Sequence, residues 1–272
     1  MKSSRRDPFN TVFALLVIAS VLTMAGFTGA RAQSDPKTAI EADSPTVSPG
    51  IHEAMLTLGR CGVPPDAVSR MLAAIVDGTI SPDDVPTLLS PLLAACRRNL
   101  PVIPLVEKLE EGLAKREPAS KIEAALDRMI QQYGFVHSLL SKRCHDLSKG
   151  ETDMITAFAS LLNKGIAPKE LEHAVMIHKG TPLERILLVL QTRAYLAQIN
   201  FEPAALNLIF EAGLRNRSFD DQWIYLPRAV VACRKRGLSD KEIAQATAAT
   251  LKNNGSLREF LDQMGFTRRE LK

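Results

Sequence analysis

From Gly62 to the end of the chain, glycine or asparagine punctuates the hydrophobic pattern every 28 to 37 residues. Each is followed by an apolar residue, then four variable residues and a second apolar residue. The instances are Gly62-Val63, Asn99-Leu100, Gly134-Phe135, Gly165-Ile166, Asn200-Phe201, Gly237-Leu238 and Gly265-Phe266. Glycine and asparagine tolerate the left-handed conformation that ends a helix. The pattern therefore predicts that one helix ends and another begins at each site.

A second helix start lies inside each of the six resulting units, at 79–82, 118–120, 150–151, 181–182, 218–220 and 256–257. Capping boxes pair a hydroxyl residue with a glutamate three positions later. Four are predicted, at Ser120/Glu123, Thr181/Glu184, Ser239/Glu242 and Ser256/Glu259, and Pro182 suits the first turn of a helix. Apolar residues in 183–190 and 243–249 have helical spacing. Each unit is therefore predicted to be a pair of helices.

A longer symmetry overlies the hairpins. Gly62, Gly165 and Gly265 open the similar stretches GVPPDAV, GIAPKEL and GFTRREL, and Gly78, Gly112 and Gly134 pair in position with Gly180, Gly213 and Gly237. The sequence thus predicts an all-α fold of about six hairpins, with a three-hairpin block (51–164) duplicated in 165–272. A single hairpin cannot bury its apolar faces, so neighbouring hairpins must stack.

The turn sequences RCGVPPDAV (60–68) and KGIAPKEL (164–171) resemble those that open tetratricopeptide and pentatricopeptide repeats. The resemblance covers roughly residues 51–272 in period and only a few residues per unit in identity. The tetratricopeptide Trp and Tyr positions are missing, as are the paired polar positions with which pentatricopeptide repeats read RNA. The resemblance therefore implies an architecture, a right-handed α-solenoid-like stack, and no function.

The N-terminus has the order of a secretory signal. Lys2, Arg5 and Arg6 precede an uncharged apolar run over 11–30, and Ala30-Arg31-Ala32 offers a small-x-small cleavage site. We predict cleavage after Ala32 and a periplasmic or secreted protein. The alternative is an uncleaved membrane anchor, since the run is about 20 residues long. The polar stretch 33–50 is interpreted as a flexible leader.

Removing residues 1–32 lowers the formal net charge from +4 to about +1. A nearly neutral surface lacks the basic footprint of nucleic-acid binding proteins, so no nucleic-acid partner is expected. The recurring basic pairs fall at predicted helix C-termini, where cations oppose the negative end of the helix dipole. These pairs are Arg97-Arg98, Lys115-Arg116, Arg215/Arg217 and Arg234-Lys235-Arg236.

The predicted export affects how the cysteines are interpreted, because disulfides persist in oxidising compartments. Cys61 and Cys96 lie at the ends of helices one unit apart, so a disulfide between them is a possibility. Cys144 and Cys233 lie two units apart and suit small buried apolar positions. No CxxC motif occurs, which argues against a zinc ribbon, a redox dithiol or a c-type haem.

No catalytic residue, metal site or cofactor is predicted. Cys144 and His145 point about 100° apart on a helix, which makes them and His137 a poor metal set. GxSxG, HExxH, phosphate-binding and dinucleotide-binding motifs are missing, and so are the Glu-Ser and Gly-Leu-Met-Gln segments of lytic transglycosylases.

Trp223 and Tyr225 are not required by the repeat pattern, and such amphipathic rings can line a partner groove. Partial burial between the fifth and sixth units is the alternative. Repeat architecture without catalytic residues favours a non-enzymatic scaffold of the cell envelope that binds a protein or peptide. An envelope enzyme with residues dispersed over several repeats, and a structural spacer, are the alternative functions.

Overall fold

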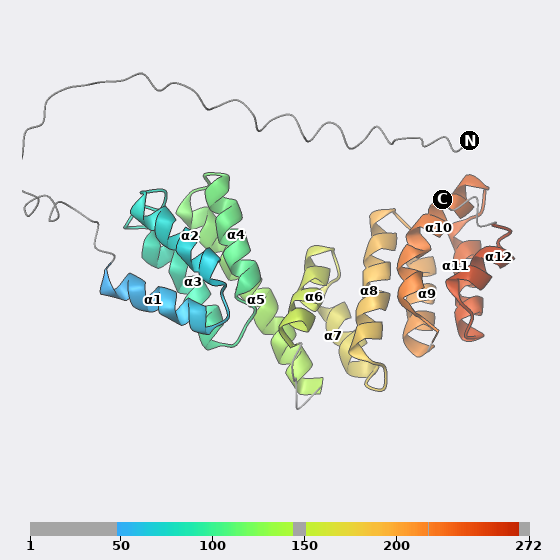
Figure 1. The fold of residues 1–272 in the computed structure, drawn as a ribbon. Helices are drawn as coiled ribbons and strands as arrows, with labels where there is room; N and C mark the ends of the chain where they lie inside the picture. Colours follow the sequence, from blue (N-terminus) through green and yellow to red (C-terminus); the bar gives the residue numbers. More distant parts are fainter. Residues whose placement is uncertain (1–47, 144–150, 217, 267–272) are drawn as a thin grey trace, which may run out of the picture. The chain divides into compact units, whose positions relative to one another are not determined.

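The computed structural model describes residues 48–143, 151–216 and 218–266, and within these ranges the regular structure is entirely helical, without strands. The helices follow one another in chain order (Figure 1). The first six are α1 (Pro49–Arg60), α2 (Pro65–Val76), α3 (Val85–Arg97), α4 (Ile103–Ala114), α5 (Ala119–Arg143) and α6 (Glu151–Asn163). Then come α7 (Pro168–Ile177), α8 (Leu183–Gln198), α9 (Pro203–Arg215), the 3-10 helix η2 (Asp221–Tyr225), α10 (Leu226–Lys235), α11 (Asp240–Lys252) and α12 (Leu257–Gln263).

The predicted signal segment and nearly all of the leader lie outside the described residues. Ser48 begins the described chain, and its side chain accepts a hydrogen bond from the amide of Ile51 as the cap of α1. Pro49 and Gly50, which were assigned to the leader, therefore belong to α1. None of the helices in the described ranges is long and apolar enough to cross a membrane.

Helices contact their neighbours in sequence and also the next helix but one. Thus α1 contacts α2 and α3, α3 contacts α5, α6 contacts α8, and α9 contacts α11. The buried side chains, mostly leucine, isoleucine, valine and alanine, form one core cluster from Met55 to Phe266. Residues Val47–Lys272 accordingly make one compact unit.

Six of the seven punctuating residues end a helix in the left-handed conformation. Their φ angles are 88° at Gly62, 53° at Asn99, 94° at Gly165, 53° at Asn200, 84° at Gly237 and 73° at Gly265. At each site the amide of the following apolar residue donates to the carbonyl five residues before it, as Val63 does to Leu58 and Phe201 to Leu196. This is the Schellman arrangement, which satisfies carbonyls left free at a helix C-terminus.

Gly134 is the exception, and the prediction of a helix end there was wrong. It lies inside α5, a continuous helix of 25 residues that merges two predicted helices into one. A Cβ atom at Gly134 would collide with the guanidinium of Arg98, which packs over this point. The glycine therefore makes room for a neighbouring side chain, and no turn forms.

Two of the four predicted capping boxes form, at Ser239/Glu242 and Ser256/Glu259. Ser120 lies inside α5, one residue past its start at Ala119. Pro182 itself is the N-cap of α8, and the Thr181 hydroxyl instead donates to the carbonyl of Leu214 at 3.2 Å. The prediction was wrong at these two sites, because α5 starts two residues earlier and α8 one residue later than the box requires.

Arginines at the end of α10 join the turns of neighbouring units. Arg234 donates to the carbonyls of Ile199 and Asn200 at 2.8 and 3.1 Å, and it forms an ion pair with Asp240 at 2.7 Å. Arg236 donates to the carbonyls of Met264 and Gly265 at 3.1 and 3.0 Å. These side chains add charged partners to carbonyls at helix ends, where cations are favourable.

We predict that Gly165→Ala lowers the free energy of unfolding by about 1 to 2 kcal/mol, because an L-residue is strained at a φ of 94°. The space around the added methyl group is open, so the effect isolates backbone strain. Urea unfolding midpoints measure it. Gly59→Ala is the control: it lies inside α1 with equal space, and a gain of up to about 1 kcal/mol is expected. Unchanged stability in Gly165→Ala would contradict the turn.

We also predict that Arg234→Met lowers the free energy of unfolding by about 2 kcal/mol at neutral pH. The hydrogen bond from Arg234 lowers the pKa of Asp240 below its ordinary value of 3.8. A carboxylate with a lowered folded-state pKa stabilises the fold above its unfolded pKa and loses that contribution as the pH falls.

The stability difference between the wild type and Arg234→Met should therefore shrink as the pH falls below about 4. Arg258→Met is the control, since the Arg258–Asp262 pair spans 3.9 Å at an exposed position and should contribute under about 0.5 kcal/mol. Equal losses in both variants, or a difference independent of pH, would contradict this account.

Candidate functional site

The two aromatic residues singled out from the sequence have different positions. Trp223 is fully buried, donates from Nε1 to the carbonyl of Ser218 at 3.0 Å, and stacks on Phe219 with 5.7 Å between ring centroids. Trp223 is thus a core residue and presents no surface to a partner in this structure. Tyr225, two residues on, is 57% exposed. The structure does not bring the pair together on one surface.

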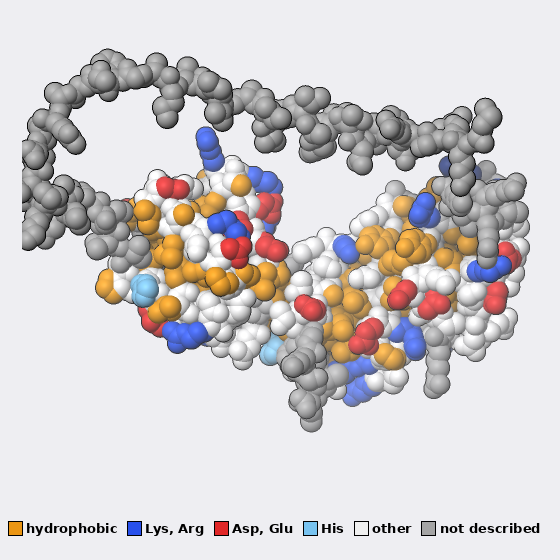
Figure 2. Space-filling model, viewed as in Figure 1, with side chains coloured by type: hydrophobic (Ala, Val, Ile, Leu, Met, Phe, Trp, Pro, Cys, Tyr) orange, Lys and Arg blue, Asp and Glu red, His pale blue; other side chains and the backbone are white. Residues whose placement is uncertain are grey.

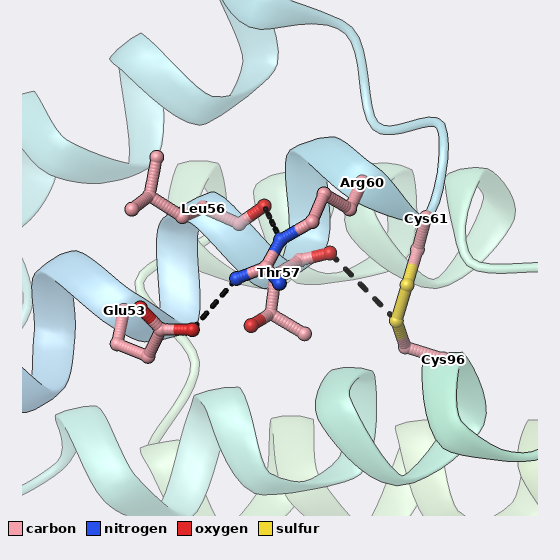
Figure 3. The surroundings of a disulfide bond; sticks show 6 residues. All are labelled: Glu53, Leu56, Thr57, Arg60, Cys61 and Cys96. Carbon is pink, nitrogen blue, oxygen red and sulfur yellow. Dashed lines mark hydrogen bonds and ion pairs between the residues drawn. A yellow bond between two sulfur atoms is a disulfide. The ribbon is translucent and has the colours of Figure 1, made fainter.

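Cys61 and Cys96 are joined by a disulfide, with 5.8 Å between their Cα atoms (Figure 3). Cys61 follows α1 and Cys96 lies in the last turn of α3, so the bond connects the turns at Gly62 and Asn99. Nearby, Arg60 forms an exposed ion pair with Glu53 at 2.6 Å. The bond closes a loop of 35 residues at the start of the described chain.

The disulfide and the Arg234 bridge occupy equivalent places. Cys96 lies three residues before Asn99 and Cys61 one residue before Gly62. In the later part of the chain, Arg234 lies three residues before Gly237 and donates to Ile199, one residue before Asn200. Both links span 35 residues. The turns at Gly62 and Asn99 are thus linked by a covalent bond, and those at Asn200 and Gly237 by a charged hydrogen bond at the same positions relative to the turns.

Of the remaining cysteines, Cys233 is buried in α10, and burial raises the pKa of its thiol. Cys144 and His145 lie outside the described residues. In the parts of the chain that are described, no cluster of His, Cys, Asp or Glu could hold a metal ion.

The candidate site is a groove of about 650 Å³ between α4, α5 and α6, hereafter the α5 groove. It is lined by Lys108 from α4, by Ala125, Arg128, Met129, Gln132 and Tyr133 from α5, and by Thr156, Ala159, Ser160 and Asn163 from α6. Its volume lies in the range of ligand sites. A smaller groove of about 190 Å³, which shares Lys108, Ala125 and Arg128, adjoins it toward the α4–α5 turn.

The length of α5 produces this groove. At about 1.5 Å per residue, α5 extends about 37 Å, roughly twice the length of α4 or α6. Helix α4 packs along the first half of α5, where Gly112 meets Ile122, and α6 packs along the second half, where Gln132 donates to Asn163 at 2.9 Å. The middle of α5, near residues 125–133, lies between these two stretches, and its side chains line the groove.

Tyr133 is the buried polar group of the groove. Its side chain is only 4% exposed, and its hydroxyl has no hydrogen-bond partner among the described residues. Burial, with a smaller contribution from the carboxylate of Glu107, raises the pKa of Tyr133 to about 12. The hydroxyl therefore stays protonated at any physiological pH and can donate to a ligand.

The charges along the groove are unbalanced. Glu111 accepts from Lys108 at 2.7 Å and also from Lys115, and these two lysines lower the pKa of Glu111 to about 2. Glu117 pairs with Lys121 at 2.8 Å. Arg128 is exposed and has no ion pair or hydrogen bond within the described ranges. The lining residues thus carry a surplus of two positive charges.

Sequence reasoning missed the α5 groove. Its members span residues 108 to 163 on three helices, with no short motif among them. The available signal was the predicted hairpin around Gly134, where the interval of 31 residues was shorter than its neighbours.

Comparison of the chain with protein-family models, with curated proteins and with solved structures finds no match. The function must therefore be argued from the chain's own residues.

We predict that the protein recovered from a bacterial periplasm begins at Gln33 and has two alkylatable thiols when denatured without reductant, and four after reduction. Intact mass measures both numbers. Removing the bond by Cys61→Ser with Cys96→Ser should lower the free energy of unfolding by about 3 to 4 kcal/mol, because the closed loop spans 35 residues. Four free thiols without reductant would contradict the disulfide.

Proposed function

We propose that this chain is an exported cell-envelope protein whose helical hairpins form a right-handed, α-solenoid-like stack. In this proposal the two blocks, 51–164 and 165–272, arose by duplication of three hairpins, and the protein is a non-enzymatic scaffold. It binds a peptide segment of a protein partner in the α5 groove. The observation that carries the proposal is the groove itself, formed where the α5 helix continues through Gly134.

Three features support the architecture. Six left-handed turns lie at predicted positions, helices contact the next helix but one, and two pairs of adjacent turns are linked through residues at the same positions relative to those turns. Gly112 and Gly213, which the duplication pairs, both lie where a Cβ atom would collide with a side chain from the following segment, Ile122 or Phe219. The Cys61–Cys96 disulfide supports export, because such bonds persist outside the reducing cytoplasm.

The chemistry of the groove supports binding over catalysis. A general acid or base acts best with a pKa near the working pH. Tyr133, at about 12, and Glu111, at about 2, are both far from neutrality, and Glu111 is neutralised by two lysines. The apolar floor of Ala125, Met129 and Ala159 between polar rims suits peptide side chains.

The surface also supports a protein partner over nucleic acid. On the face in Figure 2, lysine and arginine side chains lie among acidic and hydrophobic ones, without the continuous basic stripe that nucleic acid requires.

Selection from a phage-displayed peptide library tests the function. Peptides selected on the wild type should bind Ser160→Trp at least about tenfold more weakly, because the indole fills the groove beside Ala159. Ser138→Trp is the matched control, since Ser138 is exposed on α5 and does not line the groove. The proposal fails if no peptide is enriched, or if the enriched peptides bind Ser160→Trp as well as the wild type.

A further inference from the structure

We propose that the α5 groove recognises an acidic peptide segment, in which a carboxylate contacts Arg128 and the hydroxyl of Tyr133 while small apolar side chains lie on Met129 and Ala159. This inference rests on the proposed function and specifies its ligand.

The lining residues of the groove carry a surplus of positive charge. Glu111 is shared by Lys108 and Lys115, and Glu117 is taken by Lys121, so the acids of the two adjoining grooves are already paired. One lysine charge and the charge of Arg128 remain without a counterion among the lining residues. The carboxylate of Glu107, which is not a lining residue, lies near enough to Tyr133 to raise its pKa and offsets part of this surplus. A guanidinium binds a carboxylate through two parallel hydrogen bonds, which makes Arg128 the natural anchor for an acidic side chain.

The hydroxyl of Tyr133 is a second feature, independent of charge. The residue is 96% buried, and its hydroxyl makes no hydrogen bond within the described residues. Because no buried polar side-chain atom in these residues lacks a partner, this hydroxyl is the part of Tyr133 that reaches solvent. The other polar side chains of the groove are occupied: the hydroxyls of Thr156 and Ser160 donate to helix carbonyls at 2.8 and 2.7 Å. The hydroxyl of Tyr133 is therefore accessible at the groove and can donate to an acceptor on the ligand.

The apolar residues of the groove floor determine which side chains of the peptide can lie beside its carboxylate. Ala125 and Ala159 are small, Met129 is flexible and half-buried, and these residues lie beside Arg128 and Tyr133. Such a surface accepts alanine- or isoleucine-sized side chains and adapts to their shape. A free phosphate would use the cations but leave the floor uncovered, so a peptide is the better fit.

Calorimetry of residues 33–272 with two synthetic dodecapeptides tests the inference. One alternates alanine or isoleucine with glutamate or aspartate, and the other carries glutamine and asparagine at the acidic positions. We expect the wild type to bind the acidic peptide about tenfold more tightly, and Arg128→Glu to abolish that preference. Tyr133→Phe should weaken the acidic peptide about tenfold without changing the urea midpoint, because no hydrogen bond within the protein is lost.

Arg228→Glu is the matched control. Arg228 is exposed on α10, outside the groove, and has no ion pair or hydrogen bond in the described chain. The affinity of this variant for the acidic peptide should therefore stay within about twofold of the wild type. Equal affinity for the two peptides, or equal losses in Arg128→Glu and Arg228→Glu, overturns the inference. If phage selection yields groove-dependent peptides without acidic residues, the acidic ligand is wrong while the scaffold stands. If selection yields none, the scaffold itself fails.

Discussion

The fold depends on how the chain satisfies the carbonyl groups at its helix ends. The last four carbonyls of an α-helix have no partner within the helix, and helices that pack against one another cannot leave them all to water. Six left-handed turns solve this problem in the same way, and an apolar residue follows each turn. In five of them that residue is buried, and in the sixth Leu238 is partly buried against the core. Adjacent turns are then linked to each other, by Cys61–Cys96 near the start and by Arg234 and Arg236 near the end.

The proposed binding site lies where this solution is not used. At Gly134 the chain continues as a helix, so α5 has a middle section that neither α4 nor α6 covers completely. The missing turn at Gly134 thereby creates a concave surface, and no extra segment is inserted into the chain. Two polar groups at this surface, the exposed Arg128 guanidinium and the hydroxyl of the otherwise buried Tyr133, make no hydrogen bond within the described chain, so a ligand can bind them without breaking one.

Local rules predicted the parts of this protein that local interactions determine. Asn99 and Gly237 end helices because few residues adopt a positive φ without strain. The Cys61–Cys96 spacing of 35 residues is two short of the interval between the turns at Gly62 and Asn99, so the two cysteines lie beside neighbouring turns. Gly134 shows the limit of the rule. Glycine inside a helix costs about 1 kcal/mol relative to alanine, and packing of Arg98 against the bare backbone can offset this, which no local pattern reveals.

The sequence could not decide whether Trp223 is buried or exposed, and it did not reveal the groove, for the same physical reason. Burial of Trp223 depends on Phe219 beside it and on Phe260, 37 residues away, and the groove depends on three helices at once. Amphipathic character identifies residues that can be either buried or exposed, and only the tertiary packing decides between these outcomes.

Hydrogen exchange across the middle of α5, followed by mass spectrometry, tests the central claim most directly. If α5 is continuous, the amides of residues 130–138 exchange as slowly as those of residues 122–129, because each is bonded within one helix. A rapidly exchanging segment that begins at Gly134 would show that the helix ends there, and it would remove the structural basis of the groove.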